Sequence, residues 1–73
     1  MNFGERLKEL RIQSGLTQKA LAEKLGVSPT GYAGYEQGYR EPDFKTLVKI
    51  CKTFKVSADY LLGLEDDTGA KQQ

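Results

Sequence analysis

Residues 17–38 read TQKALAEKLGVSPTGYAGYEQG, and this stretch carries most of the information about the fold. It contains two short helical patterns on either side of a tight turn at residues 26–28. Gly26 can supply the left-handed backbone conformation that such a turn needs. Ser28 followed by Pro29 is a strong start signal for a helix, because proline suits the first helical position. The stretch therefore predicts two helices packed against each other across a tight turn.

Caps and apolar periodicity predict three further helices. The first begins after Asn2, because Glu5 stands three residues on and completes a capping box. Asp43 caps another, whose apolar residues recur with helical spacing. Ser57 caps a short last helix that Gly63 closes. No useful stretch alternates apolar and polar residues with the period of a strand, so the sequence predicts an all-α fold of five short helices.

The same pattern predicts the domain boundary and the core. Residues 65–73 are polar and lack a core residue, so we expect one domain over residues 1–64 and a disordered polar tail over residues 65–73. The side chains expected to face inward are Phe3, Leu7, Leu10, Leu21, Ala22, Leu25, Tyr32, Tyr35, Leu47, Ile50, Cys51 and Phe54. Near the end of the domain, one or two of the residues expected to close the core would be exposed to a second subunit. These residues are Tyr60, Leu61, Leu62 and Leu64.

Composition excludes several classes of protein. The chain has 73 residues, of which 38% are hydrophobic and 29% charged, as in a soluble globular domain. It has one cysteine and no histidine, so it can form no internal disulfide, zinc site or histidine-based catalytic group. We therefore expect no enzyme, cofactor or metal. No apolar run approaches the roughly 18 residues of a membrane span, and the N-terminus lacks the plan of a signal peptide, so we expect a cytoplasmic protein.

The net charge of +1 does not by itself indicate a nucleic-acid partner, but its distribution is uneven. Residues 1–64 carry ten Lys and Arg against seven Asp and Glu. Residues 65–73 carry one Lys against three acidic residues. The expected domain is therefore mildly basic, and the tail partly cancels its charge.

Residues 17–38 also meet the mechanical requirements of a helix-turn-helix, whose second helix lies in the DNA major groove. Ala22 is small where the two helices would cross closely. Over residues 3–64 the sequence resembles the Cro/C-repressor-type helix-turn-helix family, also called the lambda-repressor-like or XRE family. The matching pieces are RLKELRIQSGLTQKALAEKLGVS, YEQGYREP and LVKICKTFKVSADYLLG. The resemblance implies a compact five-helix DNA-binding domain that acts as a dimer on an operator with two-fold symmetry.

The resemblance also implies which positions contact DNA. Thr17 matches the cap before the second helix, Gln18 falls where the family contacts a phosphate or anchors the recognition helix, and Lys19 is a neighbouring exposed cation. Base- and phosphate-contacting positions correspond to Ser28, Pro29, Thr30, Gly31, Ala33 and Gly34. Backbone contacts are common at the positions of Gln37, Tyr39 and Arg40. We expect Gln18, Ser28 and Arg40 to bind phosphates and fix the register on the duplex. Glu36 matches a position that the family uses for structure.

The recognition helix departs from the family pattern. Relatives typically carry long polar side chains there, whereas this chain has only small residues, at Thr30, Gly31, Ala33 and Gly34. Of these, only Thr30 can hydrogen-bond a base edge. Three interpretations stay open. The bare helix can approach DNA closely and gain specificity from methyl contacts, water and DNA shape; the domain can have given up base reading to bind protein; or the glycines can be engineered.

These observations lead us to expect a sequence-specific transcriptional regulator of double-stranded DNA, and more specifically a repressor, with residues 29–37 in the major groove. We expect a homodimer on a palindromic operator, bacterial or phage-encoded and associated with the nucleoid when bound. Without a second domain, the dimer would use the surface around the fifth helix. The alternative is a non-catalytic protein-interaction module on the same fold, antitoxin-like or adaptor-like, with weakened or lost base reading.

Overall fold

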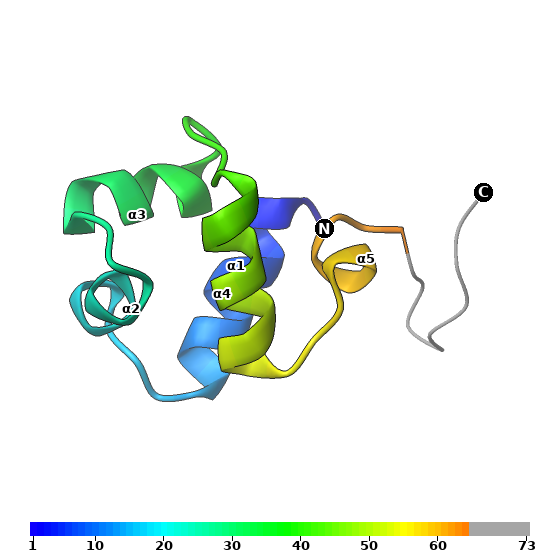
Figure 1. Ribbon diagram of the computed structural model, residues 1–73, viewed down its shortest axis with the longest axis horizontal. Coiled ribbons are helices and arrows are strands. Elements are labelled where there is room, and N and C mark those ends of the chain that lie inside the picture. Colours follow the sequence, from blue (N-terminus) through cyan, green and yellow to red (C-terminus); the bar gives the residue numbers. More distant parts are fainter. Residues whose placement is uncertain (65–73) are drawn as a thin grey trace.

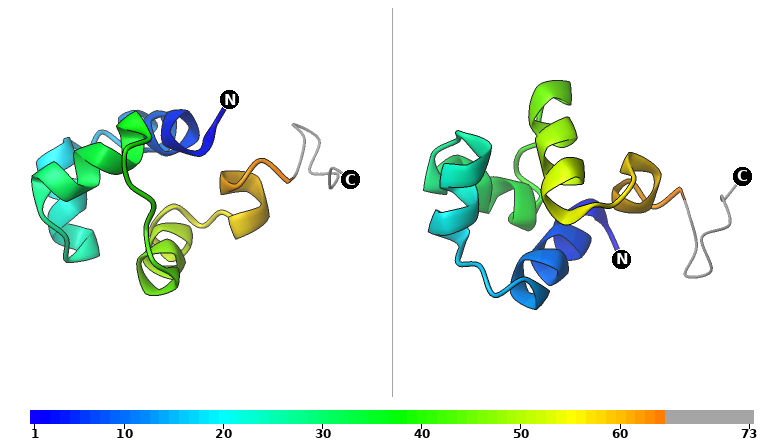
Figure 2. Two further views of the ribbon diagram at one scale, coloured as in Figure 1. Left: turned by 90° about the horizontal axis from the view of Figure 1, so that it is seen from above. Right: turned by 60° about the horizontal axis from the view of Figure 1, so that its bottom comes forward.

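The computed structural model describes residues 1–64, and the tail expected over residues 65–73 lies outside the described residues. The described part of the chain forms five helices and no strand, which confirms the predicted all-α fold. The helices are α1 (Phe3–Gln13), α2 (Gln18–Leu25), α3 (Pro29–Gln37), α4 (Phe44–Phe54) and α5 (Ala58–Leu61). The pair α2 and α3 lies at one end of the molecule, α1 and α4 lie in the middle, and α5 lies at the other end (Figure 1, Figure 2).

Each helix begins at the side-chain cap that the sequence predicts. Asn2 Oδ1 accepts from the backbone N–H of Glu5 at 2.9 Å, and the Asn2 N–H donates to Glu5 Oε1 at 3.1 Å, so the capping box is present. Side chains also accept from the backbone at the other four starts, which are Thr17, Ser28, Asp43 and Ser57. Such caps satisfy N–H groups that the first turn of a helix leaves unpaired.

The core lies between the helices, and all five helices contribute to it. Its buried side chains are Leu7, Leu21, Ala22, Leu25, Tyr32, Tyr35, Ile50 and Leu61. The rings of Tyr32 and Tyr35 meet edge to face, with centroids 6.0 Å apart and an interplanar angle of 78°. The prediction that both tyrosines belong to the core is thereby confirmed. The Lys49 ammonium donates to the carbonyl oxygen of Leu25 at 3.4 Å and links α4 to the end of α2.

Gly4 sets the distance between α1 and α3. A Cβ atom at Gly4 would lie 2.8 Å from the carbonyl oxygen of Tyr35 and closer still to that of Glu36. These neighbours are backbone atoms at the end of α3, so they cannot turn aside as a flexible side chain can. A side chain at this position would therefore force the two helices apart.

The last turn of the domain is only partly buried. Leu61 is fully buried, whereas Leu62 is 53% exposed and Leu64 is 47% exposed. The sequence predicts that one or two of the residues near the end of the domain are exposed, and in the structure these are Leu62 and Leu64. Within residues 1–64, none of the helices combines the length and apolar character needed to cross a membrane.

Candidate nucleic-acid interface

The outer face of α3 borders a groove with a volume of about 530 Å³. The groove receives residues from the start of α2, from α3 and from the loop that follows α3. Its lining consists of Gln18, Pro29, Thr30, Ala33, Gly34, Gln37, Tyr39 and Arg40. All eight are among the twelve positions that the resemblance implies for DNA contact, so the fold brings most of the expected site onto one surface.

The helix starts beside this groove offer few free N–H groups. Thr17 Oγ1 accepts from the N–H of Ala20, and Ser28 Oγ accepts from the N–H of Gly31, each at 3.0 Å. Pro29 has no N–H. Among the described residues, the backbone N–H groups of Gln18 and Lys19 at α2, and of Thr30 at α3, are the ones left without an internal acceptor in these first turns. An approaching phosphate can accept from these groups.

One interpretation of the sequence was that the small residues leave the surface of α3 uncovered, so that DNA can approach it closely. In the structure the two glycines of α3 are covered. Gly31 and Gly34 are both buried. A Cβ atom built on Gly34 would lie 2.9 Å from Cγ and 3.0 Å from Cδ of Arg40, so the Arg40 side chain covers the space above Gly34. The absence of side chains at these two positions makes room for a side chain from the following loop.

Glu36 holds the recognition helix in place from its inner side. Its carboxylate, 3% exposed, receives Arg11 Nε at 2.7 Å and Nη2 at 3.3 Å from α1. Gln18 Nε2 from α2 donates to it at 3.1 Å, and the Tyr32 hydroxyl donates at 2.5 Å. One carboxylate thus joins three helices. Of the two roles that the resemblance implies for Gln18, the structure shows the anchoring of the recognition helix.

The titration of these groups reflects their mutual contacts. Burial alone would raise the pKa of Glu36, but the hydrogen bonds from Arg11, Tyr32 and Gln18 outweigh it and hold that pKa below its usual value. The hydrogen bond to Glu36 raises the pKa of Arg11. Burial, together with the bond to Glu36, raises the pKa of the Tyr32 phenol. The network is therefore fully charged at Arg11 and Glu36 around neutral pH.

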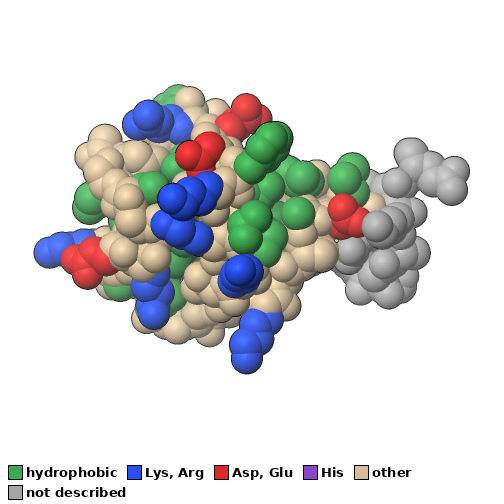
Figure 3. Space-filling view, in the orientation of Figure 1, with side chains coloured by type: hydrophobic (Ala, Val, Ile, Leu, Met, Phe, Trp, Pro, Cys, Tyr) green, Lys and Arg blue, Asp and Glu red, His purple; other side chains and the backbone are tan. Residues whose placement is uncertain are grey.

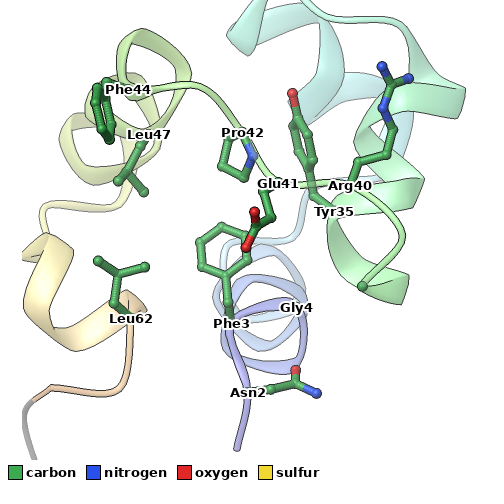
Figure 4. Close-up of a pocket in the computed structure, with 11 residues that line it drawn as sticks. Asn2, Phe3, Gly4, Tyr35, Arg40, Glu41, Pro42, Phe44, Leu47 and Leu62 are labelled. Carbon is green, nitrogen blue, oxygen red and sulfur yellow. The ribbon is translucent and has the colours of Figure 1, made fainter.

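A second surface lies between α1, α4 and α5, and the sequence analysis identified only its part around the fifth helix. It is an apolar pocket of about 400 Å³, to which Phe3, Phe44, Leu47 and Leu62 contribute. Figure 4 shows Phe44 and Leu47 from α4 on one side of the pocket, with Phe3 from α1 and Leu62, which directly follows α5, on the other sides. Phe44 is 88% exposed. The sequence offered one signal for this pocket, because Phe44 is a large apolar residue that lies outside the predicted core stripe.

Side chains that could bind a metal ion do not gather in the described residues. Residues 1–64 hold no group of three or more Cys, Asp and Glu side chains with the proximity a metal ion requires. Cys51 is half-buried in the apolar stripe of α4, and burial raises the pKa of its thiol.

Comparison with known proteins places these features in a family. A family model described as helix-turn-helix matches residues 7–61. The chain is 45% identical over 73 residues to the HTH-type transcriptional regulator ImmR of Bacillus subtilis, covering 100% of this chain and 57% of ImmR. It is 52% identical over 60 residues to the uncharacterized HTH-type transcriptional regulator YqaE of the same organism, covering 82% of this chain and 52% of YqaE. The chain therefore spans little more than half the length of these two relatives.

A solved structure shares the fold. The P22 c2 repressor protein, crystallised in complex with a synthetic operator, superposes with a TM-score of 0.80 and 32% sequence identity. The match covers 85% of this chain and 94% of that chain. This match, together with the five helices of the described residues, confirms the predicted lambda-repressor-like architecture.

Proposed function

Because this chain belongs to the helix-turn-helix family of transcriptional regulators, we propose that it represses transcription by binding double-stranded DNA through the outer face of α3. The observation that supports this most directly is the groove beside α3, which eight of the twelve expected contact positions line. A repressor with the same architecture has been crystallised on an operator. We further propose that the chain acts in the cytoplasm, is encoded by a bacterium or a phage, and is associated with the nucleoid when bound.

Docking follows from the exposed groups around the groove. With α3 in the major groove, Thr30, Ala33 and Gln37 face the base edges, since they lie on the outward face of the helix. Lys19 and the free N–H groups at the start of α2 lie beside α3 and bind the phosphate backbone. Such contacts fix the orientation of the domain on the duplex. The contacts to base edges then determine which DNA sequence the domain prefers.

The apolar surface at α4 and α5 supports a homodimer. Phe44 is 88% exposed, Leu62 is 53% exposed and Val48 is 50% exposed. Figure 3 shows hydrophobic side chains gathered on this side of the molecule, away from the α2–α3 end. Exposed apolar residues that lie together mark interaction surfaces. To bind two half-sites one helical turn apart, a two-fold dimer formed here has to hold its two recognition helices about 34 Å apart.

The proposal is tested by selecting bound duplexes from a random pool, at about 50 mM and then about 200 mM salt, a range over which phosphate contacts lose much of their strength. An enriched palindrome that survives the higher salt supports a dimeric repressor. Failure to enrich any duplex at either salt overturns the proposal and favours the alternative, a protein-interaction module on the same fold.

A further inference from the structure

The side chain of Arg40 follows the outer face of α3 back toward the start of that helix. Its Cβ, Cγ and Cδ lie 3.4, 2.9 and 3.0 Å from the position that a Cβ atom on Gly34 would occupy. One turn further back, its Nη1 lies 3.6 Å from the corresponding position on Gly31. The two glycines are three residues apart and therefore lie on one face of α3. They form a shallow channel, and the aliphatic part of Arg40 lies in it.

The start of this path is fixed by the backbone. The N–H of Arg40 donates to the carbonyl oxygen of Gly34 at 3.2 Å, and the N–H of Tyr39 donates to the same oxygen at 2.9 Å. The loop therefore turns back over the end of α3 and directs residue 40 onto the helix. Figure 4 shows the Arg40 side chain pointing away from Phe3 and Leu62, which line the apolar pocket on the other side of this loop.

The guanidinium group at the end of the path is available to a ligand. Arg40 is exposed, and no other described residue forms a hydrogen bond or an ion pair with its guanidinium. Its neighbours in the groove include Thr30 and Ala33, which are too short to screen it. The guanidinium, with its planar array of N–H donors, therefore has donors free for a ligand in the groove.

We propose that Arg40 is a base-reading residue of this domain: laid across Gly34 and Gly31, it presents its guanidinium to a guanine in the major groove. This inference rests on the proposed function, and it changes the role expected from the sequence, in which Arg40 binds phosphates. The long polar side chain that α3 lacks is supplied from the loop. An arginine fork binds O6 and N7 of guanine with two hydrogen bonds, which makes this pair the commonest specific contact to DNA.

The position of the guanidinium favours a base over a phosphate. A loop arginine that bound the backbone would extend away from α3 toward the rim of the interface. The guanidinium of Arg40 instead reaches back to Gly31 in the N-terminal half of α3, and the N-terminal residues of a recognition helix are the ones that contact base edges. Packing of its aliphatic part in the channel also restricts the conformations of the side chain, so less freedom is lost on binding.

The first test compares the wild-type chain with Arg40→Ala and Arg40→Lys in the duplex selection, followed by affinity measurements on single-base-pair variants of the selected operator. The wild type should prefer guanine at one position of each half-site by roughly 5- to 150-fold. Both variants should lose this preference and keep the preferences at other positions. Lysine keeps the charge but lacks the planar fork, so Arg40→Lys should retain more of the overall affinity than Arg40→Ala. The matched control is Lys19→Ala, which should weaken all duplexes by the same factor.

The second test blocks the channel. A methyl group at Gly34→Ala would displace Cγ and Cδ of Arg40 but meets no backbone of another element, so the helix should form at least as well as before. Thermal unfolding checks that this variant stays folded. It should lose the guanine preference in the wild-type background and cause no further change in preference in the Arg40→Ala background, because both substitutions act on the same contact.

The outcomes separate the inference from the proposed function. If Arg40→Ala weakens every duplex equally and leaves all base preferences intact, Arg40 binds the backbone and the inference is wrong, while the proposed function stands. A folded Gly34→Ala variant with the wild-type preference overturns the inference as well. Failure of the wild-type chain to select any duplex overturns the proposed function, and the inference falls with it.

Discussion

Replacement of Glu36 with glutamine is expected to destabilise the domain by about 3 kcal/mol at neutral pH. The Glu36 carboxylate is 3% exposed and accepts hydrogen bonds from Arg11, Gln18 and Tyr32. Glutamine has nearly the same shape, but it carries no charge and offers one acceptor oxygen beside an NH2 group that donates. The substitution therefore keeps the packing at this site and removes both the negative charge and part of the accepting capacity.

The magnitude follows from the groups that remain. Removing one partner of a buried ion pair costs about 3–5 kcal/mol, because the other charge stays buried without compensation. Arg11 is 13% exposed and keeps a hydrogen bond of 2.9 Å to the carbonyl oxygen of Leu16, so the lower end of this range applies. A domain of this size has a free energy of unfolding of about 4–11 kcal/mol. For such a domain, a loss of about 3 kcal/mol lowers Tm by roughly 12–24 °C.

The pH dependence of this effect has a defined sign. The pKa of Glu36 in the folded chain lies below its usual value of 4.5, so the folded state binds a proton at this carboxylate less readily than the unfolded state does. The contribution of Glu36 to stability is therefore complete above pH 4.5 and is lost as the pH falls through the lower folded-state pKa. The difference between the wild type and Glu36→Gln should be constant near neutral pH and shrink in acid.

Urea unfolding, followed by circular dichroism at a series of pH values, measures both effects. Glu23→Gln is the matched control, because it makes the same chemical change at an exposed position of α2 and should alter stability by less than about 0.5 kcal/mol. The reasoning would be refuted if Glu36→Gln stayed within about 1 kcal/mol of the wild type at neutral pH. A difference that persists unchanged in strong acid would refute the electrostatic part of it.

Three further outcomes are expected. Gly4→Ala should lower the free energy of unfolding by about 3 kcal/mol or more in urea titrations, because its methyl group meets backbone carbonyl groups of α3; a neutral effect would contradict the close crossing. Lys55 follows the end of α4 in the left-handed conformation at φ +56°, which glycine adopts more easily than lysine. Lys55→Gly should therefore raise the urea midpoint, with a gain of about 0.5–1 kcal/mol in the free energy of unfolding. A lower midpoint would contradict this. If the proposed dimer forms through α4 and α5, Leu62→Ser should weaken it by about tenfold or more in sedimentation equilibrium, since each copy loses a leucine that the contact would bury. An unchanged dissociation constant would exclude Leu62 from the interface.

Most of the fold could be predicted from the sequence because its determinants are local. A cap such as Asn2 or Ser28 acts on a backbone group three residues away, and an apolar stripe identifies the buried face of one helix without reference to any other. These signals predicted the starts of all five helices and the burial of Tyr32 and Tyr35. The helix-turn-helix arrangement then placed eight of the expected contact positions around one groove.

The remaining features depend on contacts between residues far apart in the chain. The Arg11–Glu36 pair joins residues 25 positions apart. The sequence does not show which of the basic side chains of the chain pairs with a given carboxylate. The same holds for Gly4, whose role depends on where α3 ends in space. Arg40 was expected in an open loop on phosphates, because nothing local indicates that the loop folds back over Gly34. The small residues of α3 suggested a bare helix, and only the packed structure shows what occupies their space.

The convergence of three helices on Glu36 limits how this motif can be transferred between scaffolds. The segment that contains α2 and α3 includes Gln18, Tyr32 and Glu36, but the guanidinium that compensates the acid comes from α1. A grafted helix pair would therefore bury an acid without its counter-ion. A host scaffold has to provide an arginine in the place of Arg11, or the graft has to exchange Glu36 for an apolar residue that fills the same volume.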